Sequence, residues 1–237
     1  MRACHLLGTL RRGEGDTFDA GLIDGPRGRG TIVAIGEHEL TLAFAWGESP
    51  PPLLPVHLII GLPRPQTARD ILRDATTLGV SGIHFVRSER GEASYAASSL
   101  WSSGEWQRQV VAGAAQAFCT RLPAITHGRT LTETLATLPA NRAPTDASAA
   151  IAHHRFLLDN SEATGALATA SVSRDGPWAG ATTVVLAIGS ERGWSPGERE
   201  LFRAHGFALV HLGPRVLRTE TAVVAAVTLA RAKLESA

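Results

Sequence analysis

Short apolar strands alternate with helical segments from about residue 56 onward, and this alternation limits the fold more than any other feature of the sequence. The run 183–188 is the clearest strand, and 208–211 is a second one. The run 221–234, after the second strand, is an almost wholly apolar helix. Parallel strands need a crossover connection, which is usually a helix. The sequence therefore predicts an α/β domain built on a parallel sheet.

The first segment, about 1–46, has a different sequence pattern. It reads as short strands separated by turns, with a Gly- and Pro-containing turn at 24–28 and clean alternation of apolar and polar residues at 39–44. The run 47–52, which ends in three prolines, is a stiff linker. We expect a small antiparallel β-barrel over residues 1–50 and the α/β domain over 51–237.

Composition limits the function less sharply. The net charge of the 237-residue chain is +1, which does not indicate nucleic-acid binding by itself. Lys233 is the only lysine among 23 basic residues, but an Arg-rich composition follows equally from a GC-rich genome. No apolar run approaches the roughly 20 residues that span a bilayer. The two cysteines, Cys4 and Cys119, are too few for a disulfide framework. A cytoplasmic protein without a membrane segment is expected.

Two polar, glycine-bearing loops each leave a strand and open a helix. They cover residues 188–196 and 212–222. Because the carboxyl ends of parallel strands meet at one edge of a sheet, these loops together predict a ligand crevice. In the first loop, Gly189 and Gly193 allow the main chain to approach a ligand closely. A simple turn followed by a helix cap explains the same residues, and no dinucleotide or P-loop pattern is present.

The second loop concentrates charge. Arg215 and Arg218 lie three residues apart, and Glu220 can orient one of them through a charge-assisted pair. Thr219 is a candidate N-cap of the last helix. One guanidinium could hold a phosphate while the other steadies a developing anion on a base. The alternative is a surface salt bridge beside a helix cap.

The sequence resembles the family of 16S rRNA uridine-N3 methyltransferases, which belong to the knotted SPOUT superfamily. The block 212–222 matches almost letter for letter, and Ile188-Gly189-Ser190-Glu191-Arg192-Gly193 follows the family's other loop. Shorter matches occur at 78–80, 88–90, Gln116 and 121–123. His5, 10–11, 15–16 and 24–25 resemble the family's N-terminal RNA-binding barrel of PUA type, here shortened.

The resemblance implies an S-adenosylmethionine-dependent methyltransferase with a trefoil knot in its C-terminal domain, acting on N3 of a uridine in 16S rRNA. It implies Arg218 and Glu220 as catalytic residues. It implies that the cofactor is held by Leu158, Asp159, Ile188, Gly189, Glu191, Gly193, Leu212, Gly213, Val216, Leu217 and Thr219. It implies RNA contacts by Arg11, Arg90, Arg121 and Arg215.

The resemblance also implies a homodimer. The apolar helix 221–234 is a candidate for the dimer interface, and burial inside its own domain is the alternative. No metal is expected, because the histidines show no ligand spacing.

Departures from the family pattern leave two other functions open. Ser190 and Arg192 alter the first loop, and several charges usual in the family are missing, such as a lysine at the position of Asp74. A methyltransferase with a drifted RNA target would explain the lost charges. An RNA-binding or ribosome-assembly protein with weak or no catalysis would explain the altered loop.

Overall fold

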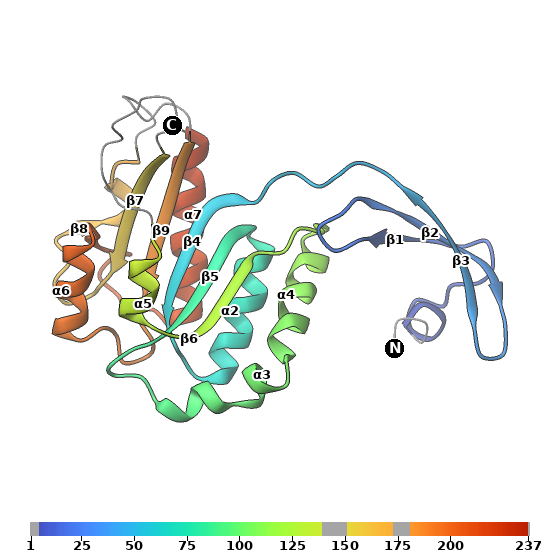
Figure 1. Ribbon diagram of the computed structural model, residues 1–237. Helices are drawn as coiled ribbons and strands as arrows, with labels where there is room; N and C mark the ends of the chain where they lie inside the picture. The colour runs from blue at the N-terminus through green and yellow to red at the C-terminus, as the bar shows by residue number, and fades with distance from the viewer. Residues whose placement is uncertain (1–4, 139–150, 173–180, 237) are drawn as a thin grey trace. The chain divides into compact units, whose positions relative to one another are not determined.

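The computed structural model describes residues 5–138, 151–172 and 181–236, and the chain forms two compact units (Figure 1). The first unit consists of Met1–Pro52 and Phe118–Leu122. The second unit consists of Leu53–Ala117 and Pro123–Ala237. The first unit thus includes a short segment that the chain reaches only after it has built part of the second.

The first unit is a three-stranded antiparallel sheet in the order β1-β2-β3. A single π-helical turn, η1 (His5–Thr9), precedes the sheet, whose strands are β1 (Thr17–Gly21), β2 (Arg27–Ile35) and β3 (Leu40–Trp46). The alternating pattern thus correctly predicts antiparallel strands. The strands form an open sheet, since β1 and β3 each pair with β2.

The segment Phe118–Leu122 is fastened to the turn between β1 and β2. The N–H of Asp24 donates to the carbonyl of Thr120 at 2.8 Å, and the Oγ1 of Thr120 donates to the carbonyl of Gly25 at 2.5 Å. The N–H of Leu122 donates to the carboxylate of Asp24 at 3.0 Å. These bonds satisfy main-chain groups that a turn would otherwise leave to water.

The second unit is built on a seven-stranded sheet in the order β6-β5-β4-β9-β7-β10-β8, with every neighbouring pair parallel. Its strands are β4 (Leu54–Gly61), β5 (Val80–Arg87), β6 (Ala124–Thr130), β7 (Ile151–Leu158), β8 (Gly165–Ala166), β9 (Ala181–Ile188) and β10 (Ala208–His211). The prediction of a parallel α/β sheet is confirmed. The trefoil knot stays a prediction.

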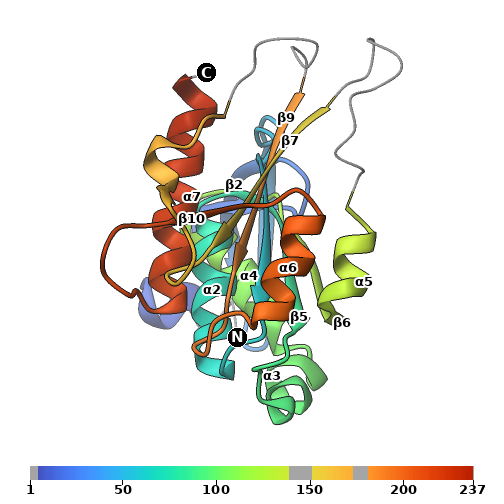
Figure 2. The same cartoon turned by 90° about the vertical axis from the view of Figure 1, so that its left-hand side faces the viewer.

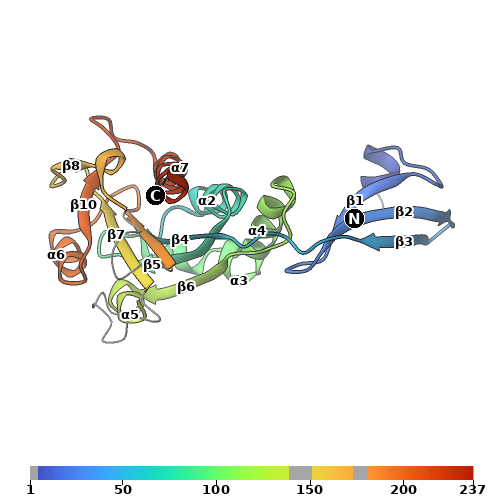
Figure 3. The ribbon, with the colours of Figure 1, turned by 90° about the horizontal axis from the view of Figure 1, so that it is seen from above.

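Helices cover both faces of this sheet (Figures 1 and 3). One face carries α2 (Pro65–Thr77), α4 (Glu105–Gln116) and α7 (Thr219–Ser236). The other carries α5 (Leu131–Ala136) and α6 (Pro196–Ala204), as Figure 2 also shows. Short helical pieces are η2 (Ala93–Ala97), α3 (Ser99–Ser102) and η3 (Leu167–Thr169).

Sequence periodicity explains why these helices dock. In α2, Pro65 begins the helix, and a stripe of small and branched side chains faces the core at Ala68, Ile71, Leu72 and Ala75. A capping box begins α6: the Oγ of Ser195 accepts the N–H of Glu198, and the Glu198 carboxylate accepts the N–H of Ser195.

Helix α7 buries an apolar stripe within the second unit. Its fully buried residues are Val223, Ala226, Val227, Ala230 and Leu234. These five residues therefore follow the second of the two expectations for this helix, which is burial inside its own domain and not exposure at a dimer interface. Val224, by contrast, is 37% exposed. Among the described residues, no helix has the length and apolar character needed to cross a membrane.

Candidate active site at the carboxyl edge of the parallel sheet

The two loops singled out in the sequence lie at the same edge of the sheet. They follow β9 and β10, and the strand between these two is β7. Leu158, the last residue of β7, is in register with Ile188 on one side and Val210 on the other. The loops after β9, β7 and β10 therefore meet at adjacent strand ends, where parallel sheets bind ligands.

A side chain joins the β9 loop to the β10 loop. The Oγ1 of Thr219 donates to the carbonyl of Gly189 at 3.4 Å, and Thr219 is buried. The prediction that Thr219 is the N-cap of α7 is wrong by one residue. Thr219 is the first helical residue, and the N–H of Ala222 donates to the carbonyl of Arg218 at 2.8 Å, so Arg218 holds the cap position.

The β9 loop turns sharply and passes close to the end of β4. The N–H of Gly193 donates to the carbonyl of Ser190 at 2.8 Å, which closes the turn. A Cβ on Gly61 would lie 2.9 Å from the main-chain nitrogen of Ser190, so glycine at that position permits the approach. In the β10 loop, Gly213 has φ of +113° and open space where a Cβ would stand.

The carboxylate of Glu191 supports a neighbouring helix. It accepts the N–H of Arg64 at 3.1 Å and the Oγ1 of Thr67 at 3.2 Å. Both donors lie at the start of α2, whose own N-cap has no side-chain partner. A negative charge at that position also interacts favourably with the helix dipole. Glu191, predicted as a cofactor residue, therefore uses its side chain to hold the β9 loop against α2.

Asp159 holds the β7 loop against α6. Its Oδ2 accepts Nε of Arg199 at 2.6 Å, and its Oδ1 accepts the N–H groups of Ser161 and Glu162 at 2.8 and 2.7 Å. Burial by itself would raise the pKa of Asp159, but the hydrogen bonds from Arg199, Glu162 and Ser161 outweigh it and lower the pKa. The sequence reasoning missed Arg199, because its partner lies 40 positions away.

The loop after β5 joins the same edge. The N–H of Glu89 donates to the carboxylate of Glu198 at 2.9 Å, which links this loop to the start of α6. The guanidinium of Arg90 donates to the carbonyl of Arg192 at 3.4 Å, which links it to the β9 loop. Arg90, a predicted RNA contact, therefore lies beside the candidate cofactor loop.

The charged residues of the β10 loop point into solvent. Arg215 and Arg218 are exposed, and Val216 is 80% exposed, whereas Leu212 and Leu217 are half-buried. The ion pair expected between Glu220 and one of the two arginines is not formed within the described part of the chain. Glu220 lies in the first turn of α7, where its charge favours the helix.

The remaining predicted RNA contacts, Arg11 and Arg121, belong to the first unit. Arg11 is exposed and has φ of +50°. The Nε of Arg121 donates to the carbonyls of Pro50 and Pro51 at 3.1 and 3.0 Å, which fastens the linker to the segment Phe118–Leu122. The structure therefore gives Arg121 a role within its own unit.

Two buried hydroxyls at the site lack partners. The Oγ atoms of Ser88 and Ser190 have no hydrogen-bond partner among the described residues, although Ser190 is only 8% exposed. A buried polar atom left unpaired costs about 1–3 kcal/mol, so these two hydroxyls have a hydrogen bond to form with water or with a ligand. Across residues 5–138, 151–172 and 181–236, no three His, Cys, Asp or Glu side chains are grouped as metal ligands.

Comparison with known proteins shows which family has a similar sequence. A family model described as an RNA methyltransferase domain matches residues 49–231. The ribosomal RNA small subunit methyltransferase E of Treponema pallidum is 39% identical over 226 residues, which cover 95% of this chain and 80% of that protein. A protein of the same name, numbered 1, from Borreliella burgdorferi is 26% identical over 98% of this chain and 90% of its own length.

The fold agrees with these matches. The crystal structure of a ribosomal RNA small subunit methyltransferase E from Neisseria gonorrhoeae, bound to S-adenosyl methionine, superposes with a TM-score of 0.76 at 21% identity. The superposition covers 98% of this chain and 89% of that one. Since the family model spans most of the chain and a relative aligned over 95% of the chain is 39% identical, this protein belongs to the family of RNA methyltransferases that includes the ribosomal RNA small subunit methyltransferases E.

Proposed function

We propose that this protein transfers a methyl group from S-adenosylmethionine to N3 of a uridine in 16S rRNA. The observation that carries the proposal is the joining of the β9 and β10 loops at one sheet edge by the Thr219–Gly189 hydrogen bond. Family membership supports the reaction class, because the relatives are named as small-subunit rRNA methyltransferases. Sequence resemblance supports the choice of uridine N3.

The residues at the edge suit S-adenosylmethionine, which supplies an activated methyl group on a sulfonium. The main chain of Leu158, Ile188, Leu212 and Leu217 would contact it, with the unpartnered Oγ of Ser190 as a further hydrogen-bonding group. Open space at Gly213 leaves room for a ligand beside the main chain. Because Asp159 and Glu191 are occupied by Arg199 and by α2, we propose that these two position the loops.

Arg218 is proposed as the catalytic cation. Uridine N3 carries a proton and is a poor nucleophile until that proton passes to solvent. Negative charge develops on O2 and O4 as the N–H bond breaks, and it is neutralised when N3 takes the methyl group and the sulfonium leaves as a neutral thioether. An exposed guanidinium without an ion pair in the described residues is free to stabilise that charge. Glu220, two residues further on, is proposed to orient Arg218 once RNA is bound, and Arg215 is proposed to contact a phosphate.

Two further features of the family's proteins are proposed here. We propose that the protein is a homodimer in the cytoplasm, where small ribosomal subunits are available to it. Light scattering coupled to size-exclusion chromatography measures the molar mass in solution and therefore the oligomeric state. A mass of about twice 25.0 kDa is expected, and a mass near 25.0 kDa would contradict it.

The proposed reaction is tested in two steps. Calorimetric titration with S-adenosylmethionine should show a saturable site, and 16S rRNA from a deletion strain should accept labelled methyl groups from the purified protein. Methylation at N3 blocks Watson–Crick pairing, so reverse transcription should stop at one uridine only after treatment. Methyl transfer at another atom would leave the methyltransferase in place and refute uridine N3.

The altered β9 loop favours one competing function, an RNA-binding or assembly protein without catalysis. Arg192 brings an extra guanidinium to a loop whose carbonyl already binds Arg90. Absence of S-adenosylmethionine binding at millimolar concentration, together with retained rRNA binding, would support this alternative. Saturable cofactor binding would exclude it.

A further inference from the structure

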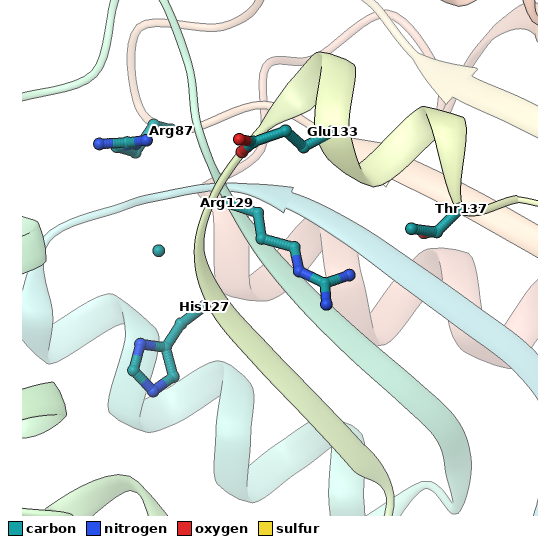
Figure 4. Close-up of a pocket in the computed structure, with 6 residues that line it drawn as sticks. Arg87, His127, Arg129, Glu133 and Thr137 are labelled. Atoms are coloured by element: carbon teal, nitrogen blue, oxygen red, sulfur yellow. The ribbon is translucent and has the colours of Figure 1, made fainter.

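A second basin lies at the carboxyl edge of the sheet, away from the two candidate loops. It has a volume of about 540 Å³ and lies where β5 and β6 end (Figure 4). Its lining residues are Arg87, His127, Gly128, Arg129, Glu133 and Thr137. β6 is three strands from β9, which corresponds to about 14 Å at the usual spacing of strands. The basin is thus on the same edge as the candidate active site and within the same unit.

The two arginines of the basin have no partner in the described part of the chain. Arg87 and Arg129 are exposed, and neither forms an ion pair or a side-chain hydrogen bond there. Other arginines of the same unit do, such as Arg69 with Glu105 at 2.5 Å. Holding two like charges near one another without a counter-ion favours an anionic ligand.

Glu133 does not neutralise these arginines by direct contact, because its carboxylate is committed to a helix cap. Its Oε2 accepts the N–H of Thr130 at 2.7 Å and the Oγ1 of Thr130 at 2.9 Å, completing the capping box of α5. These two bonds are the main causes of its lowered pKa, and the charges of Arg87 and Arg129 add to them. Two positive charges therefore face one negative charge in the basin.

The arrangement suits an extended polyanion better than a small anion. In Figure 4, Arg87 and His127 lie toward one side of the β6 ribbon, while Arg129 and Thr137 lie toward the other. The ring of His127 stacks against Trp101 at 4.8 Å and meets the edge of Trp106 at 5.9 Å, which fixes its position. Burial lowers the pKa of His127, so the ring is neutral near pH 7 and offers a hydrogen bond.

Further arginines whose guanidinium forms no ion pair with a described residue continue along this edge toward the candidate active site. They are Arg64 after β4, Arg90 after β5, Arg192 after β9, and Arg215 and Arg218 after β10. We propose that the basin binds the phosphodiester backbone of the RNA substrate a few nucleotides from the methylated base, with Arg87 and Arg129 each contacting a phosphate. This inference rests on the proposed function, because it assigns part of the same substrate.

Filter binding of the full-length protein to a 16S rRNA transcript tests the basin. Arg87→Ala and Arg129→Ala should each raise Kd about tenfold and reduce the slope of log K against log salt by about 0.7, the value for one lost phosphate contact on a single strand. Arg108→Ala is the matched control, since Arg108 is an exposed arginine of α4 outside the basin. It should change Kd less than twofold.

Glu133→Gln supplies a variant of the opposite sign. It removes the negative charge of the basin while the amide can still accept hydrogen bonds from Thr130, so rRNA affinity should rise severalfold. A merely structural role would give losses with all three basin variants. Binding of Arg87→Ala and Arg129→Ala equal to that of Arg108→Ala would overturn the proposal, as would unchanged salt slopes.

The two proposals fail separately. S-adenosylmethionine affinity, measured by calorimetry, should be the same in every variant, because the basin does not touch the β9 and β10 loops. If the wild-type protein binds rRNA through the basin and transfers no methyl group, the proposed reaction is wrong and the basin stands. If methyl transfer occurs and the basin variants keep the wild-type KM for rRNA, the proposal that the basin binds RNA is wrong and the proposed reaction is retained.

Discussion

At the scale of single residues, the carboxylates nearest the site serve the scaffold. Asp159 and Glu191 both come from sequence blocks associated with cofactor binding, but the Asp159 oxygens accept hydrogen bonds from Arg199, Ser161 and Glu162, and Oε1 of Glu191 accepts two from the start of α2. Main-chain N–H and C=O groups remain for a ligand, as do the Oγ atoms of Ser88 and Ser190, which have no partner among the described residues. Substitutions at the carboxylates should therefore act through folding and loop position.

Asp159→Asn should lower the free energy of unfolding by about 3 kcal/mol, because the buried Arg199 then keeps only the exposed Glu162, 3.3 Å away, as a counter-charge. Urea denaturation measures this. The double variant Asp159→Leu with Arg199→Met should be less destabilised than the single one, since no buried charge is left unpaired. Equal losses in the two proteins would contradict the pairing argument.

The pH dependence of this pair has a definite sign. The folded-state pKa of Asp159 lies below the ordinary value of 3.8, so the folded state binds fewer protons than the unfolded one in this range. Its contribution to stability is complete above pH 3.8 and is lost as the pH falls through the lowered pKa. Asp159→Asn should remove that part of the acid sensitivity, as measured by urea midpoints between pH 5 and 2.5.

Arg218→Ala should lower kcat by about 100-fold or more, the usual cost of removing one group that stabilises a developing anion. Calorimetric affinity for S-adenosylmethionine should not change. Arg215→Ala is the matched control in the same loop, and it should raise KM for rRNA with little change in kcat. Near wild-type kcat in Arg218→Ala would assign the anion stabilisation to another group.

At the scale of elements, close packing between strand ends sets the path of the β9 loop. Gly61→Ala places a methyl group 2.9 Å from the nitrogen of Ser190, so the loop must move away from β4. We expect a loss of about 1–3 kcal/mol in unfolding free energy and a clear fall in S-adenosylmethionine affinity by calorimetry. Gly165→Ala, where nothing lies within 4 Å, is the control and should keep the affinity. Wild-type affinity in Gly61→Ala would show that the loop position does not matter for the cofactor.

Elements with local signals could be predicted from the sequence, and contacts between distant segments could not. The capping box at Ser195 and the strand at 183–188 are local patterns, and both are present. β6 escaped prediction because residues 124–130 mix His127, Gly128 and Arg129 into an edge strand. The basin that they form with Arg87 is built from β5, β6 and α5, so no single stretch of the sequence predicts it.

The placing of the two loops at one edge was predictable, since it follows from strand direction in any parallel sheet. The bonds that fasten them were not. The Thr219–Gly189 bond spans 30 positions and the Glu191–Arg64 bond spans 127. Such partners depend on the order of strands in the sheet, and residue types alone do not determine that order.

At the scale of the whole molecule, acid should weaken the second unit through histidines on the sheet. Burial, aided by the charges of His57 and Arg129, lowers the pKa of His84 to about 4. Between pH 6.5 and about 4, His84 binds a proton in the unfolded chain and remains neutral in the folded protein. The free energy of unfolding therefore falls as the pH falls through that range. The loss attributable to His84 is at most about 3 kcal/mol.

His84→Asn should flatten the stability profile between pH 6.5 and 4. Chemical denaturation at several pH values measures it. His38→Asn is the control, because the side chain of His38 is 89% exposed. An unchanged slope in His84→Asn would place the acid sensitivity in other groups, such as His57 and His153, whose pKa values burial also lowers.

The segment Phe118–Leu122 affects the order in which the protein can be made. Domains usually complete one after another as the chain leaves the ribosome. Here the first unit needs Thr120 and Leu122 to satisfy Asp24 and Gly25, so it must wait while β4, α2, β5 and α4 are synthesised. The N-terminal sheet therefore cannot be moved to another protein as residues 1–52 alone. Such a graft would transfer the three strands without the segment Phe118–Leu122, which bonds the turn between β1 and β2.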